Sequence, residues 1–152
     1  SQLGEDKQEE MSKNLERYSL YEAYEVRQVL ETKAMDLIVR NATDSDLDEI
    51  ETAYQTMLLR FAETNTTTGE FELHQLYAKK TGSVFMEQTL NIVLSTILEM
   101  MHTTSHNVMD MHQVEEEKAD HRRIIDALHK RDSSAAQQAM YDHIQHTLDI
   151  LQ

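Results

Sequence analysis

The chain has 152 residues, with no proline, no cysteine, no tryptophan and three glycines. Sandwiches and barrels need Gly and Pro at their many turns, and a chain without cysteine has no disulfide, thiolate zinc site or Cys nucleophile. The formal net charge of −14 argues against direct binding to nucleic acid or to an anionic membrane surface. No apolar run is long enough to span a bilayer. We therefore expect a soluble, cytoplasmic, all-α protein.

The chain divides by composition into two parts. Residues 1–19 are polar and lack an apolar stripe, which favours a linker or arm. Residues 20–152 carry the apolar rhythm and are expected to form a single helical domain.

Apolar residues at spacings of three and four predict the first two helices. The first covers about 21–40, and its inward face is expected to carry Val26, Leu30, Ala34 and Leu37. Thr43 and Asp44 offer an N-cap for the second. Its inward residues are expected to be Leu47, Ile50, Tyr54, Leu58 and Phe61.

Four more helices follow. A third is expected over about 70–80, with Gly82 as a C-terminal cap. The fourth is apolar almost all round, which is typical of the buried centre of a bundle. After a poorly patterned stretch at 102–112, a fifth covers about 114–129 and a sixth reaches the C-terminus. Caps are expected at Ser83 for the fourth helix and at Asp132 or Ser134 for the sixth. The predicted fold is an antiparallel bundle of six or seven helices.

Three of the eight histidines are predicted to point into this bundle. His74, His121 and His143 each share a helical face with apolar residues, and Glu70 lies one turn before His74. Burying these groups is costly unless they hydrogen-bond one another or bind a divalent metal. The spacing alone leaves both solutions open. No role is indicated for the other five, His102, His106, His112, His129 and His146.

Arg27 lies at the border of the predicted inward face of the first helix. Its side chain could pair with Glu31 one turn later, which would be a structural role. Alternatively, it could point into the same interior pocket and hold a carboxylate with its guanidinium.

The run YEVRQVLETKAMDLIVRNATDSDLDEIE resembles the opening of the C-terminal effector-binding (FCD) domain of FadR-type GntR transcription regulators. The matching motifs, in chain order, are Arg27, Leu30 and Glu31; Ala42, Thr43 and Asp44; Glu70, His74 and Gly82; His121, Arg122, Ile124, Ala127, Leu128, Arg131 and Asp132; and Ala139, Met140 and His143. Each motif is weak alone, but four in the right order, with the first two groups counted as one motif, are fairly specific.

The resemblance implies that Glu70, His74, His121 and His143 form a metal site inside the bundle. In that family the metal is often zinc, and also nickel or manganese, and it helps hold a small carboxylate effector or stabilises the fold. Arg27 matches a position that contacts the effector's carboxylate in some members. Glutamate at position 70 replaces the family's usual aspartate, which places the metal preference in question.

The resemblance also implies partners. These regulators carry a winged helix-turn-helix before this domain, whereas only the short segment 1–19 precedes it here. We therefore expect a sensor domain, not an enzyme, that forms a homodimer, binds a small organic acid and reaches DNA only through a domain absent from this chain. A natural stand-alone protein with the same bundle is the alternative. Two further functions stay open, a metal-dependent hydrolase and an interaction bundle with structural histidines.

Overall fold

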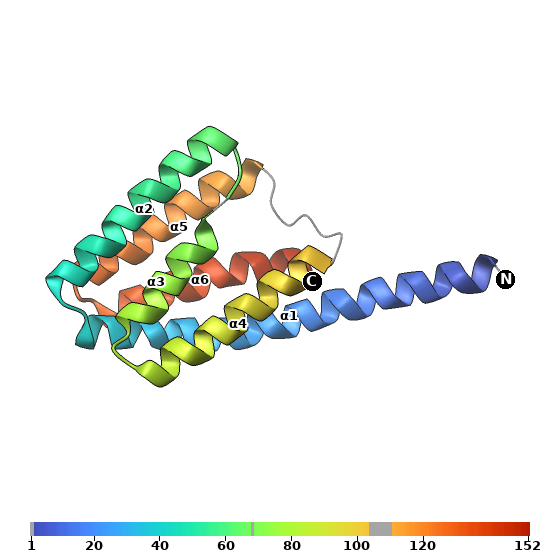
Figure 1. Cartoon of the computed structure of the whole chain (residues 1–152), viewed down its shortest axis with the longest axis horizontal. Helices are drawn as coiled ribbons and strands as arrows, with labels where there is room; N and C mark the ends of the chain where they lie inside the picture. The colour runs from blue at the N-terminus through green and yellow to red at the C-terminus, as the bar shows by residue number, and fades with distance from the viewer. Residues whose placement is uncertain (1, 68, 104–110) are drawn as a thin grey trace.

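The computed structural model describes residues 2–67, 69–103 and 111–152, which form six α-helices and no strand. The helices are α1 (Gln2–Asn41), α2 (Asp44–Thr64), α3 (Glu70–Lys80), α4 (Val84–Thr103), α5 (Met111–His129) and α6 (Ser133–Leu151). Consecutive helices run in opposite directions, and α6 packs along α1 and α5 (Figure 1). The predicted all-α antiparallel bundle is confirmed.

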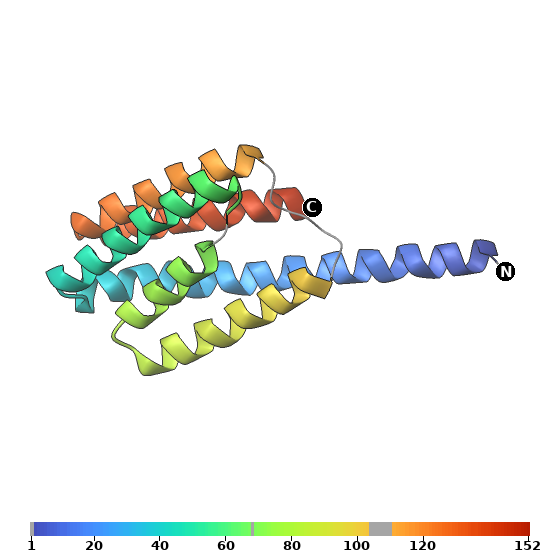
Figure 2. The same ribbon diagram turned by 45° about the horizontal axis from the view of Figure 1, so that its top comes forward.

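Helix α1 is longer than predicted. The sequence indicated a start near residue 21, but the helix begins at Gln2 and continues unbroken to Asn41. Its N-terminal part extends past the other helices in both views (Figures 1 and 2). The polar segment 1–19 is therefore helical over its described residues, and its separation from the domain as an arm stays a prediction.

Several predicted caps are confirmed. Thr43 accepts a hydrogen bond from the backbone N–H of Asp46, whose carboxylate accepts one in return from the N–H of Thr43, a capping box. Asp132 caps α6 by accepting from the N–H of Ala135. Gly82 has a φ of +69°, and a Cβ there would lie 3.0 Å from the Cβ of Asn41. Only glycine fits that turn without strain, so α3 ends where the sequence indicated.

The inward face of α1 differs from the prediction. Val26 is 52% exposed, whereas its neighbour Arg27 is buried at 1% and Glu31 at 0%. Leu30 and Leu37 are only half-buried. The helix is rotated so that two charged residues, not Val26, face the other helices, and this rotation brings Arg27 into the interior.

Helix α4 is not the buried centre of the bundle, and that prediction is wrong. It packs against α1 and α3, at the lower edge of the molecule in Figure 1. Leu90, Leu94 and Ile97 are buried, but the opposite face is open to solvent. The large apolar side chains exposed on it are Val84, Phe85, Ile92 and Leu98.

The predicted break at 102–112 lies largely outside the described residues, which leave out 104–110. Of the helices described on either side, none combines the length and hydropathy that crossing a membrane requires.

Candidate metal centre

Four side chains meet at one buried point between α3, α5 and α6. Glu70, His74, His121 and His143 each offer one ligand atom, and these atoms all lie within 4.8 Å of one another. The Oε1 of Glu70 lies 2.8 Å from the Nε2 of His74, 3.0 Å from that of His143 and 3.6 Å from that of His121. Residues predicted from three helical faces are thus brought together, and their role as ligands stays a prediction.

Helix α3 supplies two of the four groups, Glu70 and His74, because it begins at Glu70. Gly69 precedes it with a φ of +96°, in the left-handed region that favours glycine. Glu70 is therefore the first helical residue, and His74 lies one turn later on the same face. Both are buried.

The second ring nitrogen of each histidine has its own partner. The Nδ1 of His74 lies 2.5 Å from the Oε1 of Glu31, and the Nδ1 of His143 lies 2.9 Å from the Oδ2 of Asp120. The Nδ1 of His121 lies 2.9 Å from the hydroxyl of Tyr77. When each Nδ1–H donates to this oxygen, the lone pair of Nε2 faces the centre, as in metal sites oriented by outer hydrogen bonds.

The charges around the centre are unbalanced toward the negative. Glu31, Glu70 and Asp120 are buried, and the half-buried Glu117 lies beside them, whereas Arg27 is the only buried Lys or Arg among the described residues. Such an excess of carboxylates in a desolvated interior needs further positive charge.

The pKa values reflect the contacts between these carboxylates and the histidines. Burial would raise the pKa of the Glu70 carboxyl, but His74, together with His121 and His143, holds it well below its usual range. Burial would likewise lower the pKa of His143, but the nearby Glu117, Asp120 and Glu70 raise it well above its usual value. The site therefore favours positive charge at its centre.

Two buried atoms at the centre have no hydrogen-bond partner, the Nε2 of His121 and the Oε2 of Glu117. A buried polar atom without a partner costs free energy comparable to a lost hydrogen bond. Imidazole nitrogens and carboxylate oxygens are ligands for divalent transition metals, which would satisfy both atoms and supply the missing charge. The residues present fit a divalent cation.

Arg27 makes the predicted ion pair with Glu31 and also lines the interior pocket, while its role in holding a carboxylate stays a prediction. Its Nε donates to the Oε2 of Glu31 at 2.7 Å, while its Nη2 lies 3.9 Å from the Oε1 of Glu70 and has no hydrogen-bond partner. The rings of Tyr24 and Phe71 lie 5.2 and 5.4 Å from its guanidinium carbon. The buried ion pair with Glu31 thus holds the guanidinium with one donor still free.

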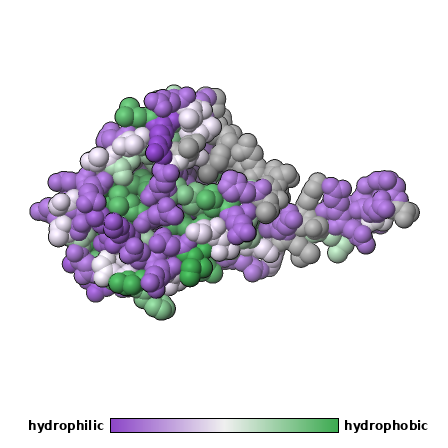
Figure 3. Space-filling view, viewed as in Figure 1, coloured by the Kyte–Doolittle hydropathy of each residue, from purple (hydrophilic) through white to green (hydrophobic). Residues whose placement is uncertain are grey.

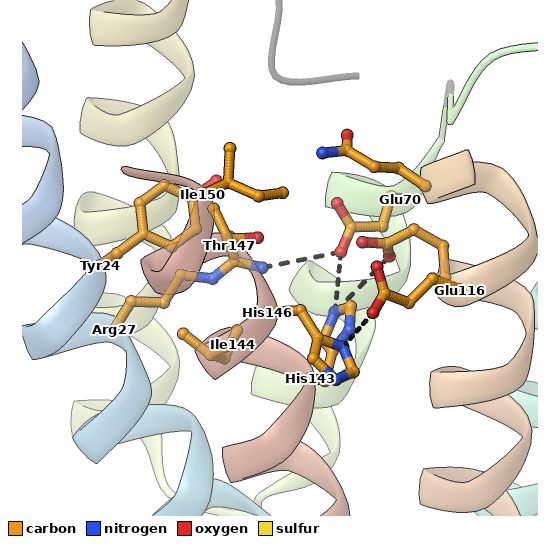
Figure 4. A pocket seen from close by; sticks show the side chains of 11 residues that line it. Tyr24, Arg27, Glu70, Glu116, His143, Ile144, His146, Thr147 and Ile150 are labelled. Carbon is orange, nitrogen blue, oxygen red and sulfur yellow. Dashed lines mark hydrogen bonds and ion pairs between the residues drawn. The ribbon is translucent and has the colours of Figure 1, made fainter. Parts of the chain in front are cut away.

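A pocket opens beside the centre. Figure 4 shows Arg27 pointing toward Glu70, with His143 below and Tyr24 and Ile150 at the edge. His146, for which the sequence indicated no role, also lines it, and its Nδ1 lies 2.9 Å from Asp120. His146 and His143 thus share the same carboxylate, and the prediction that His146 has no functional role is not tested by this contact.

Other residues at the centre were missed or underrated by sequence reasoning. Asp120, Glu117 and Tyr77 were not predicted, and Glu31 was considered only as a partner of Arg27. One signal was available for Glu117, since it precedes His121 by four residues just as Glu70 precedes His74. For Asp120 and Tyr77, only the packing of helices shows which imidazole each reaches.

Comparisons with known proteins place this geometry in a family. The FCD domain family matches residues 22–146, so the chain belongs to that family and the resemblance seen in the motifs is confirmed. No curated protein sequence gave a match.

Two solved structures share the fold. Streptococcus agalactiae GntR has a TM-score of 0.71 at 21% identity, over 86% of this chain and 58% of that one. E. coli McbR/YncC has a TM-score of 0.66 at 15% identity, over 86% of this chain and 62% of that one. The chain therefore spans about three fifths of the length of these proteins.

Proposed function

We propose that this chain is the ligand-sensing domain of a FadR-type GntR transcription regulator. It would bind a divalent metal through Glu70, His74, His121 and His143. The observation that carries the proposal is the buried Nε2 of His121, which has no hydrogen-bond partner and faces the Oε1 of Glu70 at 3.6 Å. Membership of the FCD family supports the sensing role.

The effector in this proposal is a small organic acid. When bound, the metal would supply a Lewis-acidic site for one carboxylate oxygen. Arg27 would donate to the carboxylate through its Nη2, which has no hydrogen-bond partner. Glu31 keeps the guanidinium in place through the 2.7 Å bond to its Nε.

The charge of the site sets an order of binding. Even with His74 and His143 protonated beside Arg27, the four carboxylates of Glu31, Glu70, Glu117 and Asp120 leave the metal-free pocket with net negative charge, which disfavours an anion. A divalent cation removes most of that repulsion. We expect the organic acid to bind only to the metal-loaded protein.

Zinc is the metal that three imidazoles and one carboxylate suit best in this proposal, with nickel or manganese as alternatives. The longer side chain of Glu70, in place of aspartate, bears on this choice, because it changes the reach of the only carboxylate in the predicted ligand set.

The proposed regulation also involves a DNA-binding domain and a second copy of this chain. The remaining two fifths of the structural neighbours leave room for a DNA-binding domain, and we propose that effector binding alters how that domain contacts DNA. A regulator of this type acts where the genome is, so we propose a cytoplasmic location.

We further propose that the domain forms a homodimer. The apolar side chains Val84, Phe85 and Ile92 are exposed on α4, and Figure 3 shows hydrophobic residues along that lower edge. Contiguous exposed apolar surface is typical of protein interfaces. Phe85→Asp should shift the protein to monomer in sedimentation equilibrium, whereas Leu59→Asp on α2, also an exposed apolar residue, should not.

Metal analysis of the purified protein tests the central proposal. We expect about one divalent ion per chain and its loss in a His121→Ala, His143→Ala double variant. Stoichiometry far below one in the wild type after exposure to zinc, nickel and manganese would exclude the metal site.

A further inference from the structure

Glu117 lies closer to the metal centre than its absence from the predicted ligand set suggests. Its Oε2 lies 3.5 Å from the Nε2 of His121 and 3.6 Å from the Nε2 of His143. These are the same two nitrogens that the Oε1 of Glu70 faces. The two carboxylates therefore converge on one pair of imidazoles.

The Oε2 of Glu117 is a desolvated oxygen without a hydrogen bond. The side chain is 13% exposed, and this atom has no solvent contact and no hydrogen-bond partner in the described structure. Distances of 3.5 and 3.6 Å are too long for hydrogen bonds to the imidazoles. Atoms that share one ion through bonds of about 2.1 Å stand roughly 3.0–3.4 Å apart. The spacing is close to that of co-ligands.

The neighbouring glutamates on α5 are placed differently. Glu116 is 44% exposed and pairs with His146 at 3.1 Å, while Glu115 is 77% exposed and pairs with Lys118. Helical geometry explains the difference, because Glu117 lies one turn before His121 and so shares its inward face.

We propose that Glu117 is a fifth protein ligand of the metal, which makes the set three imidazoles and two carboxylates. This inference rests on the proposed metal site. It also gives Glu117 a second effect, because its carboxylate holds a position that an external carboxylate would otherwise take. An organic acid must then displace Glu117, and Glu117 sets the concentration at which the sensor responds.

The proposal has a consequence for metal choice. Structural zinc sites are almost always four-coordinate, whereas manganese and nickel accept five or six ligands. Five protein ligands therefore favour manganese or nickel over zinc relative to a variant that lacks the Glu117 carboxylate.

The test compares Glu117→Gln with the matched control Glu115→Gln, which removes the same charge from an exposed site on the same helix. Metal affinity is measured by chelator competition with Co²⁺ and with Ni²⁺, and acetate binding by the visible spectrum of the Co²⁺-loaded protein. We expect Glu117→Gln to bind metal roughly 10–100-fold more weakly and acetate at least about tenfold more tightly than wild type. Glu115→Gln should match wild type in both.

A third variant separates coordination from charge. Glu117→Asp keeps the charge but withdraws the oxygen, so it should lose metal affinity as Glu117→Gln does. Wild-type affinity in Glu117→Asp, or equal affinities in Glu117→Gln and Glu115→Gln, would overturn the inference while leaving the metal site standing. Failure of the wild type itself to bind metal would instead overturn the proposed function. Circular dichroism of each variant without metal checks that the bundle is folded.

Discussion

Helices α3 and α4 are neighbours in the chain and in space, yet α3 buries charged and polar side chains while α4 leaves large apolar ones exposed. The polar helix α3 buries Glu70, His74 and Tyr77, whereas the strongly apolar α4 exposes Val84, Phe85 and Ile92. Helix α3 lies against α1, α2 and α4, while α4 packs on α1 and α3.

In these two helices, the position of a residue in the bundle decides whether it is buried, and its hydropathy does not. Polar groups on α3 are tolerated in the interior because each has a partner from another helix, such as Glu31 for His74. Apolar groups on α4 remain exposed because α4 is at the edge.

Breaking the buried ion pair between Arg27 and Glu31 should give the largest loss of stability. Glu31→Gln leaves the buried Arg27 without its charged partner and removes the carboxylate that orients His74. We expect a loss of about 3–5 kcal/mol in the free energy of unfolding, measured by urea denaturation. The double variant Arg27→Met, Glu31→Gln should lose less than Glu31→Gln, because it removes both members of the pair. Equal stability of Glu31→Gln and wild type would show that the pair is not buried in solution.

The two faces of α4 should respond differently to the same kind of truncation. Leu90 is buried at 0%, and Leu90→Ala should cost about 3 kcal/mol through lost burial and a cavity. Ile92 is 68% exposed, and Ile92→Ala should stay within about 0.5 kcal/mol at concentrations where the protein is monomeric. Similar losses for the two variants in urea denaturation of the monomer would contradict the edge position of α4.

Binding of a metal at the predicted site should stabilise the folded protein. A divalent ion that binds only the folded state, at about 100 times its dissociation constant, raises the free energy of unfolding by about 2.7 kcal/mol. Thermal melts with and without a chelator measure this shift, and His121→Ala should abolish it. A melting temperature that does not change on chelation of the metal-loaded wild type would favour structural histidines instead.

The partly exposed ion pair between Arg122 and Glu51 should contribute less to stability than the buried pair of Arg27 and Glu31. Arg122 and its two hydrogen bonds hold the pKa of Glu51 at about 2, below its ordinary 4.5. Because the folded-state pKa is lowered, the pair stabilises the fold above pH 4.5 and its contribution is lost as the pH falls toward 2. Glu51→Gln should cost up to about 1 kcal/mol at pH 7, since the pair is partly exposed. The cost should shrink on acidification in urea denaturation series, and a constant cost from pH 7 to pH 3 would contradict the assignment.

Much of the helical pattern could be predicted, because caps and periodicity are local properties. Thr43, Gly82 and Asp132 act where the sequence indicated. The start of α1 at Gln2 was missed because its first turns lack an apolar stripe, so periodicity carries no signal there. The inward rotation of α1 was missed because it puts charged Arg27 and Glu31 inside, against the usual preference.

Composition and apolar periodicity together were enough to predict an all-α chain. The helical faces were also enough to predict that Glu70, His74, His121 and His143 point inward, because side-chain direction follows helical periodicity. Only the tertiary structure decided which groups meet from different helices. Glu31 reaches His74, Asp120 reaches His143, and Glu117 faces two imidazoles, since distances between helices depend on packing angles that no local pattern encodes. Part of the net charge of −14 therefore lies around the predicted metal site.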